Sequence, residues 1–280
     1  MECKIKDISV YYETYGEGHP LIMIHGFGPD HHIMTGCMEP IFADRDGWQR
    51  IYFDLPGMGK TPGPDWLVNS GQMLEVVSEF IDKIIPDQHF AISGLSYGAY
   101  LARGIVREKP EAVTGLSLLV PLIIPAFEER RVPAHVSLVK DPELIKSIPA
   151  DEREDFENFI VVQTREVWER TRDEVNVGVA LANEPFLTRL QENGYPISFD
   201  VDAETGKFER PTLILMGKQD AVVGYRDAWK LIEKYPRGTF AVLGRAGHNL
   251  PIEQEGLFES LVNEWLDRVE ETLSTVKFES

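Results

Sequence analysis

A serine lies between two glycines in the segment Gly94-Leu95-Ser96-Tyr97-Gly98. The apolar run 89–92 before it predicts a buried strand, and the small-residue run 99–106 after it predicts a helix. A sharp strand-to-helix turn of this kind exposes a hydroxyl at a helix N-terminus, where a developing negative charge is stabilised. It also brings the two backbones so close together that only very small residues fit two positions on either side. The pattern therefore predicts that Ser96 is a nucleophile.

A serine nucleophile needs a general base, and beside a turn of this kind the chain order is serine, acid, histidine. The chain has seven histidines, of which His135 and His248 follow Ser96. His135 falls in an irregular, charged stretch. His248 follows the strand-like run 239–243, and a loop at a strand end can aim an imidazole back over the sheet. We therefore predict His248 as the base.

Asp220 is the predicted acid that orients the base, because it follows the strand-like run 211–217. Asp227 and Asp202 remain open as alternatives. A second placement of the acid, after the preceding strand, is disfavoured because no carboxylate occurs there before Glu128.

The apolar run 21–24 ends in His25-Gly26-Phe27-Gly28. A glycine-containing loop at a strand end can turn a backbone N–H toward a reacting carbonyl, and each such donor stabilises the transition state by roughly 3 kcal/mol. The predicted oxyanion hole consists of the backbone N–H groups of Phe27 and Tyr97. His25 is expected to support the loop by hydrogen bonding.

Taken together, these motifs resemble those of a small, capped, single-domain α/β-hydrolase, from about Ile8 to Leu266. The matching segments, in the family's order, are His25–Gly28, Asp54–Gly59, Gly94–Gly98, Met216–Asp220 and Gly247–His248. The resemblance implies the fold, the catalytic triad and hydrolysis without a metal or an organic cofactor. It does not imply a substrate, because one fold hosts many activities.

Short apolar runs alternate with amphipathic segments along both ends of the chain, which predicts an α/β fold with a doubly wound, mostly parallel sheet. By resemblance the sheet has eight strands, with a helical cap inserted after the sixth. The predicted core comprises residues 1–120 and 209–280, and the predicted cap comprises residues 121–208. Helices are expected in the cap at 142–147, 151–172, 174–183 and 185–192.

The predicted function is hydrolysis of a carboxylic ester or a similar small acyl substrate through an acyl-enzyme. Carbon–carbon bond hydrolysis of ring-fission diketones and enol-lactone hydrolysis are the enzymatic alternatives, since relatives with a serine nucleophile include both. Ser96 excludes the dehalogenase and epoxide-hydrolase mechanisms of this fold, which need an aspartate at that position. A ligand-binding sensor that has kept the fold is the alternative from another class.

Composition restricts the partners. The formal net charge of −18, from 46 acidic and 28 basic residues, argues against nucleic acid and anionic membranes. The N-terminus has no apolar signal core, no apolar run is long enough to span a membrane, and Cys3 and Cys37 need not pair, so a cytoplasmic location is expected. The oligomeric state is left open.

Several further residues have two interpretations. Arg130 and Arg131 could hold a substrate carboxylate or form a solvated basic pair. A metal site at His31 and His32 is not expected, because adjacent side chains point apart. Apolar side chains of the cap could line a pocket, although most are expected to make core contacts between cap helices: Leu122, Ile123, Phe127, Phe159, Trp168, Val179 and Phe186.

Overall fold

A computed structural model describes residues 1–203 and 206–275. Eight strands form one sheet in the order β1-β2-β4-β3-β5-β6-β9-β10. The strands β1 and β2 pair antiparallel, as do β2 and β4, and the remaining neighbours pair parallel, which confirms the predicted sheet. Their bounds are β1 (Glu2–Ile5), β2 (Ile8–Tyr15), β3 (His19–Ile24), β4 (Trp48–Phe53), β5 (Phe90–Leu95), β6 (Val113–Leu119), β9 (Thr212–Gly217) and β10 (Gly238–Leu243).

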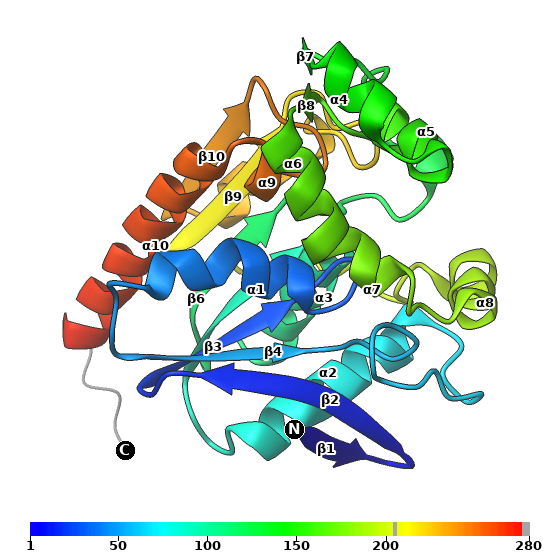
Figure 1. Ribbon diagram of the computed structural model, residues 1–280. Coiled ribbons are helices and arrows are strands. Elements are labelled where there is room, and N and C mark those ends of the chain that lie inside the picture. The colour runs from blue at the N-terminus through cyan, green and yellow to red at the C-terminus, as the bar shows by residue number, and fades with distance from the viewer. Residues whose placement is uncertain (204–205, 276–280) are drawn as a thin grey trace.

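Helices cover both faces of the sheet (Figure 1). The helices α2 (Ser70–Ile84) and α3 (Tyr97–Glu108) pack together on one face, and α1 (His32–Met38), the 3₁₀ turn η1 (Glu39–Phe42) and α10 (Glu255–Thr275) lie on the other. A short helix, α9 (Leu250–Glu253), precedes α10. The segment η4 (Asp227–Lys234), which the sequence suggests is an ordinary helix, is a 3₁₀ helix. This arrangement is the doubly wound layering that alternating strands and helices predict.

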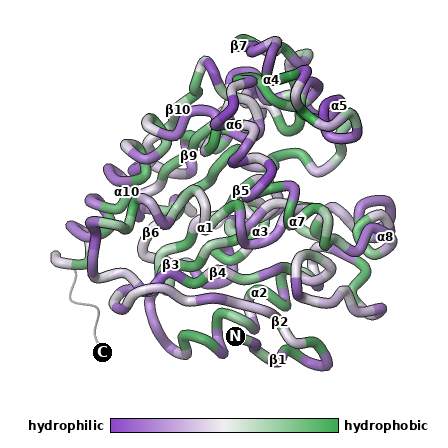
Figure 2. The backbone as a smooth tube through the Cα atoms, viewed as in Figure 1, coloured by the Kyte–Doolittle hydropathy of each residue, from purple (hydrophilic) through white to green (hydrophobic). Residues whose placement is uncertain are grey.

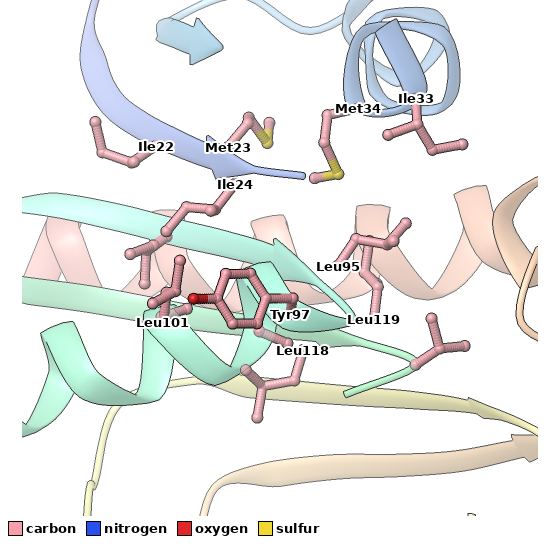
Figure 3. Close-up of a cluster of buried hydrophobic side chains, with 14 of the residues drawn as sticks. Ile22, Met23, Ile24, Ile33, Met34, Leu95, Tyr97, Leu101, Leu118 and Leu119 are labelled. Carbon is pink, nitrogen blue, oxygen red and sulfur yellow. The ribbon is translucent and has the colours of Figure 1, made fainter. Parts of the chain in front are cut away.

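The core lies between the sheet and these helices. Apolar residues are continuous along the central strands because parallel strands are buried on both faces, whereas polar residues gather on the outward turns of the helices (Figure 2). Figure 3 shows Met34 of α1 beside the end of β3, with Tyr97 and Leu101 of α3 across the sheet. All three of these side chains are fully buried, so the ends of β3 and β5 are held from both sides.

The chain leaves the sheet between β6 and β9, and residues 121–208 are here named the insertion. Its elements gather beyond the carboxyl ends of the parallel strands (Figure 1). In order they are η2 (Phe127–Glu129), β7 (Val139–Lys140), α4 (Pro142–Ser147), α5 (Ala150–Phe159), β8 (Val162–Gln163), α6 (Arg165–Arg170), the π-helical turn η3 (Thr171–Asn176), α7 (Val177–Val179) and α8 (Glu184–Gly194).

Two predicted helices of the insertion are wrong. The helix expected over 151–172 stops at Phe159, and β8 then pairs with β7 in parallel. Residues 160–162 are buried, so this apolar run packs inward instead of continuing an exposed helix. The helix expected over 174–183 begins inside the π-helical turn and ends at Val179. Within the described part of the chain, no helix combines the length and apolar character needed to cross a membrane.

Candidate active site

Ser96 occupies the turn between β5 and α3 in a strained backbone conformation, with φ of 54° and ψ of −112°. A Cβ added at Gly94 would lie 2.4 Å from the carbonyl oxygen of Gly98, and one added at Gly98 would lie 2.2 Å from that of Ile24. Any larger residue at either position would therefore collide with backbone. The two glycines hold the turn in place, and the turn presents the Ser96 hydroxyl at the N-terminus of α3.

The structure brings the predicted serine, histidine and aspartate together from three separate loops. Nε2 of His248 lies 3.0 Å from Oγ of Ser96, and Nδ1 of His248 lies 2.8 Å from Oδ2 of Asp220. The other carboxylate oxygen of Asp220 accepts hydrogen bonds from the N–H groups of Val222 and Val223, at 2.8 and 2.9 Å. Because Asp220 is fully buried and its second oxygen is occupied, the carboxylate has one orientation from which to bind the imidazole.

The two alternative acids lie in other contacts. Asp227 is buried and bonds the guanidinium of Arg131 at 2.6 Å, and Asp202 pairs with Arg103. Neither carboxylate contacts His248 in the described structure.

A buried carboxylate that the sequence analysis missed supports the histidine loop. Glu253 accepts the N–H of Gly247, next to His248, at 2.5 Å and the N–H of Val161 in the insertion at 2.6 Å. Burial raises the pKa of Glu253. The residue follows a proline in a short helix, and no local pattern distinguishes it from an exposed helix glutamate. Glu253 thus joins the loop that carries the imidazole to the insertion.

The loop after β3 packs beside the serine turn, and two backbone amides at this junction are free in the described part of the chain. Among the described residues, the amides of Phe27 and Tyr97 have no hydrogen-bond acceptor. Gly28 has a φ of 105°, and a Cβ at Gly26 would lie 3.5 Å from that of Ser96, so the loop packs against the serine turn. Both free amides are therefore available to an oxyanion at this turn.

His25 supports this loop from inside the protein. Its Nδ1 bonds the carbonyl oxygen of Gly26 at 2.7 Å, and its Nε2 accepts the N–H of Leu55 at 2.9 Å. Accepting a backbone N–H requires an unprotonated Nε2, and burial correspondingly lowers the pKa of His25. The ring is neutral and tied to backbone at both nitrogens, which accords with the supporting role expected from the sequence.

Ser96 and His248 open into a cavity of about 410 Å³, within the usual range of small-molecule sites. Most of its wall is apolar, and four of the seven side chains expected from the cap line it: Leu122, Phe127, Phe159 and Val179. Phe186 makes a core contact instead, with its ring packed over Gly57 and Gly63.

Beyond Phe159 lies a second cavity of about 400 Å³, which Phe159, Val175, Val179 and Asn249 share with the first. Trp168, expected in the pocket wall, lines this second cavity instead. The amide nitrogen of Asn249 is buried and has no hydrogen-bond partner among the described residues. It is a further polar group beside His248 that the sequence analysis did not identify.

The side chains of His31 and His32 do not point apart, contrary to the expectation. Their ring centroids lie 4.2 Å apart, and potential metal-binding atoms of Asp30, His31 and His32 lie within 4.8 Å of one another. Each Nδ1 is bonded to a carboxylate at 2.7 Å, that of His31 to Asp54 and that of His32 to Asp30. The bond to Asp54 fastens the loop after β3 to the turn after β4, and the bond to Asp30 lies within the loop after β3.

Sequence comparison places this architecture in a family. A family model described as the alpha/beta hydrolase fold matches residues 19–255. The chain belongs to this family. The present chain is similar to an alpha/beta superfamily hydrolase from Oenococcus oeni PSU-1, whose crystal structure is known, with 29% sequence identity. The two structures superimpose with a TM-score of 0.86 over 96% of this chain and 99% of the other.

Two curated relatives in the family have different activities. The chain is 24% identical to a pimeloyl-[acyl-carrier protein] methyl ester esterase from Legionella pneumophila (strain Corby) over 261 residues, which cover 92% of this chain and 100% of the relative. It is 23% identical to a 2-hydroxy-6-oxo-6-(2'-aminophenyl)hexa-2,4-dienoic acid hydrolase from Metapseudomonas resinovorans over 264 residues, covering 93% and 88%.

Proposed function

We propose that this α/β-hydrolase is a serine hydrolase that cleaves a carboxylic ester or a similar small acyl substrate. The observation that carries the proposal is the unbroken hydrogen-bond chain from Asp220 through His248 to Ser96 at the wall of an apolar cavity. The esterase activity of the Legionella relative supports the same reaction class.

In the proposed acylation step, Oγ of Ser96 attacks the ester carbonyl while Nε2 of His248 accepts the hydroxyl proton. Asp220 stabilises the resulting imidazolium and holds the ring in the required tautomer. The amides of Phe27 and Tyr97 stabilise the negative oxygen of the tetrahedral intermediate. His248 then returns the proton to the departing alkoxide, which leaves as an alcohol, and the acyl group remains on Ser96.

Deacylation repeats the same proton transfers with water. His248 accepts a proton from the attacking water, and the new tetrahedral intermediate collapses to the carboxylic acid while the proton returns to Ser96.

We propose that the insertion acts as a cap over this centre. By covering Ser96 it would exclude bulk water from the acylation step and shape the acyl and alcohol sites.

The first test is covalent labelling with a fluorophosphonate probe, followed by measurement of the intact mass. We expect one adduct on the native protein and none on Ser96→Ala, and a panel of simple esters should then be hydrolysed by the native protein alone. A folded native protein that forms no adduct and cleaves no ester would contradict the proposal and favour a ligand-binding role.

Carbon–carbon bond hydrolysis is the second candidate because of the Metapseudomonas relative. The same serine, histidine and oxyanion donors can serve that reaction, so the site geometry does not separate the two. A dienoate diketone and a set of simple esters should be compared at equal enzyme concentration. Rapid ester turnover without cleavage of the diketone would eliminate this candidate, and the reverse result would replace the ester proposal.

A further inference from the structure

Arg130 lines the cavity that contains Ser96, and its guanidinium is held by backbone carbonyls from two loops. Nε donates to the carbonyl of Ile124 at 2.7 Å, and Nη2 donates to that of Pro125 at 2.7 Å. Nη1 donates to the carbonyl of Val222, in the loop that follows Asp220, at 3.1 Å. Three bonds in different directions fix the plane of the guanidinium at the cavity wall.

These bonds leave the positive charge without an anionic partner. Within the described residues, no carboxylate lies at ion-pair distance from Arg130, whereas the adjacent Arg131 pairs with Asp227 at 2.6 Å. Arg130 is also the only residue with a permanent charge among the described residues that line this cavity. Burial lowers the pKa of Arg130, but an arginine remains protonated at neutral pH. The cavity therefore has a fixed cation, with no described carboxylate at ion-pair distance, in a mostly apolar wall.

The unused donors of Arg130 match a planar anion. A guanidinium has five N–H groups, and the bonds to Ile124, Pro125 and Val222 use one on Nε and one on each Nη. One N–H therefore remains on each terminal nitrogen. When the two remaining donors lie on one edge of the guanidinium, they bind the two oxygens of a carboxylate, an arrangement that lysine cannot reproduce.

We propose that Arg130 is a specificity-determining residue that binds a free carboxylate of the substrate, so that the preferred esters are anionic. The inference rests on the proposed ester hydrolysis and specifies its substrate class. The carboxylate can belong to the acyl part, as in a monoester of a dicarboxylic acid, or to the alcohol part, as in an ester of a hydroxy acid. Both sources present the same group to the same guanidinium.

The second cavity, beyond Phe159, is lined by negative charges, which supports binding of the substrate carboxylate at Arg130. Asp151, Glu152 and Asp155 line it, and no basic side chain lines it among the described residues. A carboxylate would be repelled there and attracted by Arg130. The whole chain carries a net charge of −18, so a positive side chain in a cavity wall is unusual for this protein. Arg130 therefore distinguishes the cavity at Ser96 from the acidic second cavity.

The test compares matched esters. The 4-nitrophenyl monoester of glutaric acid is paired with 4-nitrophenyl pentanoate for the acyl part, and the acetyl ester of 3-hydroxypropionate is paired with propyl acetate for the alcohol part. We expect the native protein to prefer the anionic member of one pair by roughly 10- to 100-fold in kcat/KM, mainly through KM. The pair that shows the preference identifies the source of the carboxylate.

Variants separate recognition from a merely structural role. Arg130→Gln should remove the preference, with a larger loss of kcat/KM on the anionic ester than on its neutral partner, and Arg130→Lys should restore part of the preference. Arg131→Gln, one residue away, is the matched control and should keep the preference. No preference in the native protein, or an equal loss on anionic and neutral esters in Arg130→Gln, would overturn the inference while the ester proposal stands.

A binding measurement tests the role of Arg130 even if the protein hydrolyses none of these esters. Calorimetric titration of Ser96→Ala with glutarate and with glutaramide requires no turnover. We expect glutarate to bind more tightly and to lose that advantage when Arg130→Gln is added. Equal binding of both compounds contradicts the role of Arg130, whereas a missing fluorophosphonate adduct on the native protein contradicts ester hydrolysis.

Discussion

The sheet and the insertion hold their parts of the site in different ways. Around Ser96, backbone packs directly on backbone, and the serine turn and the loop after β3 leave no space for a single added carbon at Gly98. The insertion contributes side chains that remain partly open to solvent: Phe127, Phe159 and Val179 are 60%, 38% and 49% exposed. In the proposed mechanism, groups that must be aligned for bond cleavage thus lie on the tightly packed sheet loops, and groups that would contact variable parts of a substrate lie on the more exposed insertion.

The comparison predicts that the chemistry depends on the sheet loops far more than on the insertion. Asp220→Asn should lower kcat by about 10⁴-fold, because an amide would donate to Nδ1 of His248 and leave the wrong tautomer facing Ser96. The backbone bonds to Oδ1 can persist, so thermal stability should change little. Ester turnover and the melting temperature measure the two effects.

Asp227→Asn provides the control for this experiment. Asp227 is a buried aspartate of the same region, paired with Arg131 and not with His248. The ester turnover of Asp227→Asn should stay within a few-fold of the native value. A larger loss in Asp227→Asn than in Asp220→Asn would reverse the assignment of the acid.

The second prediction compares a tightly packed glycine at the sheet, Gly98, with one in the insertion, Gly178. Gly98→Ala places a methyl group 2.2 Å from the carbonyl oxygen of Ile24 and should lower the free energy of unfolding by about 3 kcal/mol. Gly178→Ala in α7 meets the backbone nitrogen of Asp30 at 2.4 Å, but α7 can shift with the insertion. We expect a loss of roughly 1 kcal/mol there, with a changed KM. Urea unfolding of both variants measures the two losses of unfolding free energy. Equal losses would mean that the insertion is as rigid as the sheet.

The third prediction concerns acid sensitivity of the sheet. Burial lowers the pKa of His19, at the start of β3, to about 4, with a smaller contribution from His89. The unfolded chain, with a histidine pKa near 6.5, then binds more protons than the folded one between about pH 6.5 and pH 4. Stability should fall as the pH decreases through this range, by about 2 kcal/mol from this residue.

The variant His19→Gln isolates that contribution. Nε2 of His19 bonds Oγ1 of Thr114 at 2.8 Å, and a glutamine amide can keep one such bond. The difference in unfolding free energy between the two proteins should shift in favour of the variant as the pH decreases from 7 to 4.5. A difference that does not change with pH would rule out this histidine as the source.

The smallest effect is expected in the insertion. Phe159 lies between the two cavities with its ring against that of His248, at a centroid distance of 6.1 Å. Phe159→Ala should connect the cavities and raise kcat/KM for bulky esters by a few-fold, while small esters and the melting temperature change little. A thousandfold loss on every ester would instead place Phe159 in the catalytic machinery and weaken the comparison.

The same contrast explains what the sequence could predict. The strands around Ser96 have continuous apolar runs that end in glycine turns, and those patterns are local. The break after Phe159 was missed because it depends on distant partners: β8 pairs with β7, and the N–H of Val161 bonds Glu253, 92 residues away. The charged helical segments on either side favour one continuous helix, although the β-branched run 160–162 by itself favours a strand.

Among the site residues, the serine, histidine and aspartate have motifs, whereas Arg130 does not. The sequence leaves Arg130 and Arg131 equivalent, as neighbours in a charged stretch. Their difference arises from contacts on other loops, since Arg131 meets Asp227 while Arg130 meets the carbonyl of Val222.

In the proposed mechanism, the position of Glu253 makes the alignment of His248 depend on the insertion. One carboxylate bonds both the loop of His248 and Val161, so moving the insertion outward would leave a buried oxygen without its donor, at a free-energy cost of about 1–3 kcal/mol. The insertion and the imidazole loop are thereby mechanically linked. Entry of substrate and departure of product would each be accompanied by a small displacement of the base, so the protein would be best aligned for reaction only during the interval in which the insertion is closed.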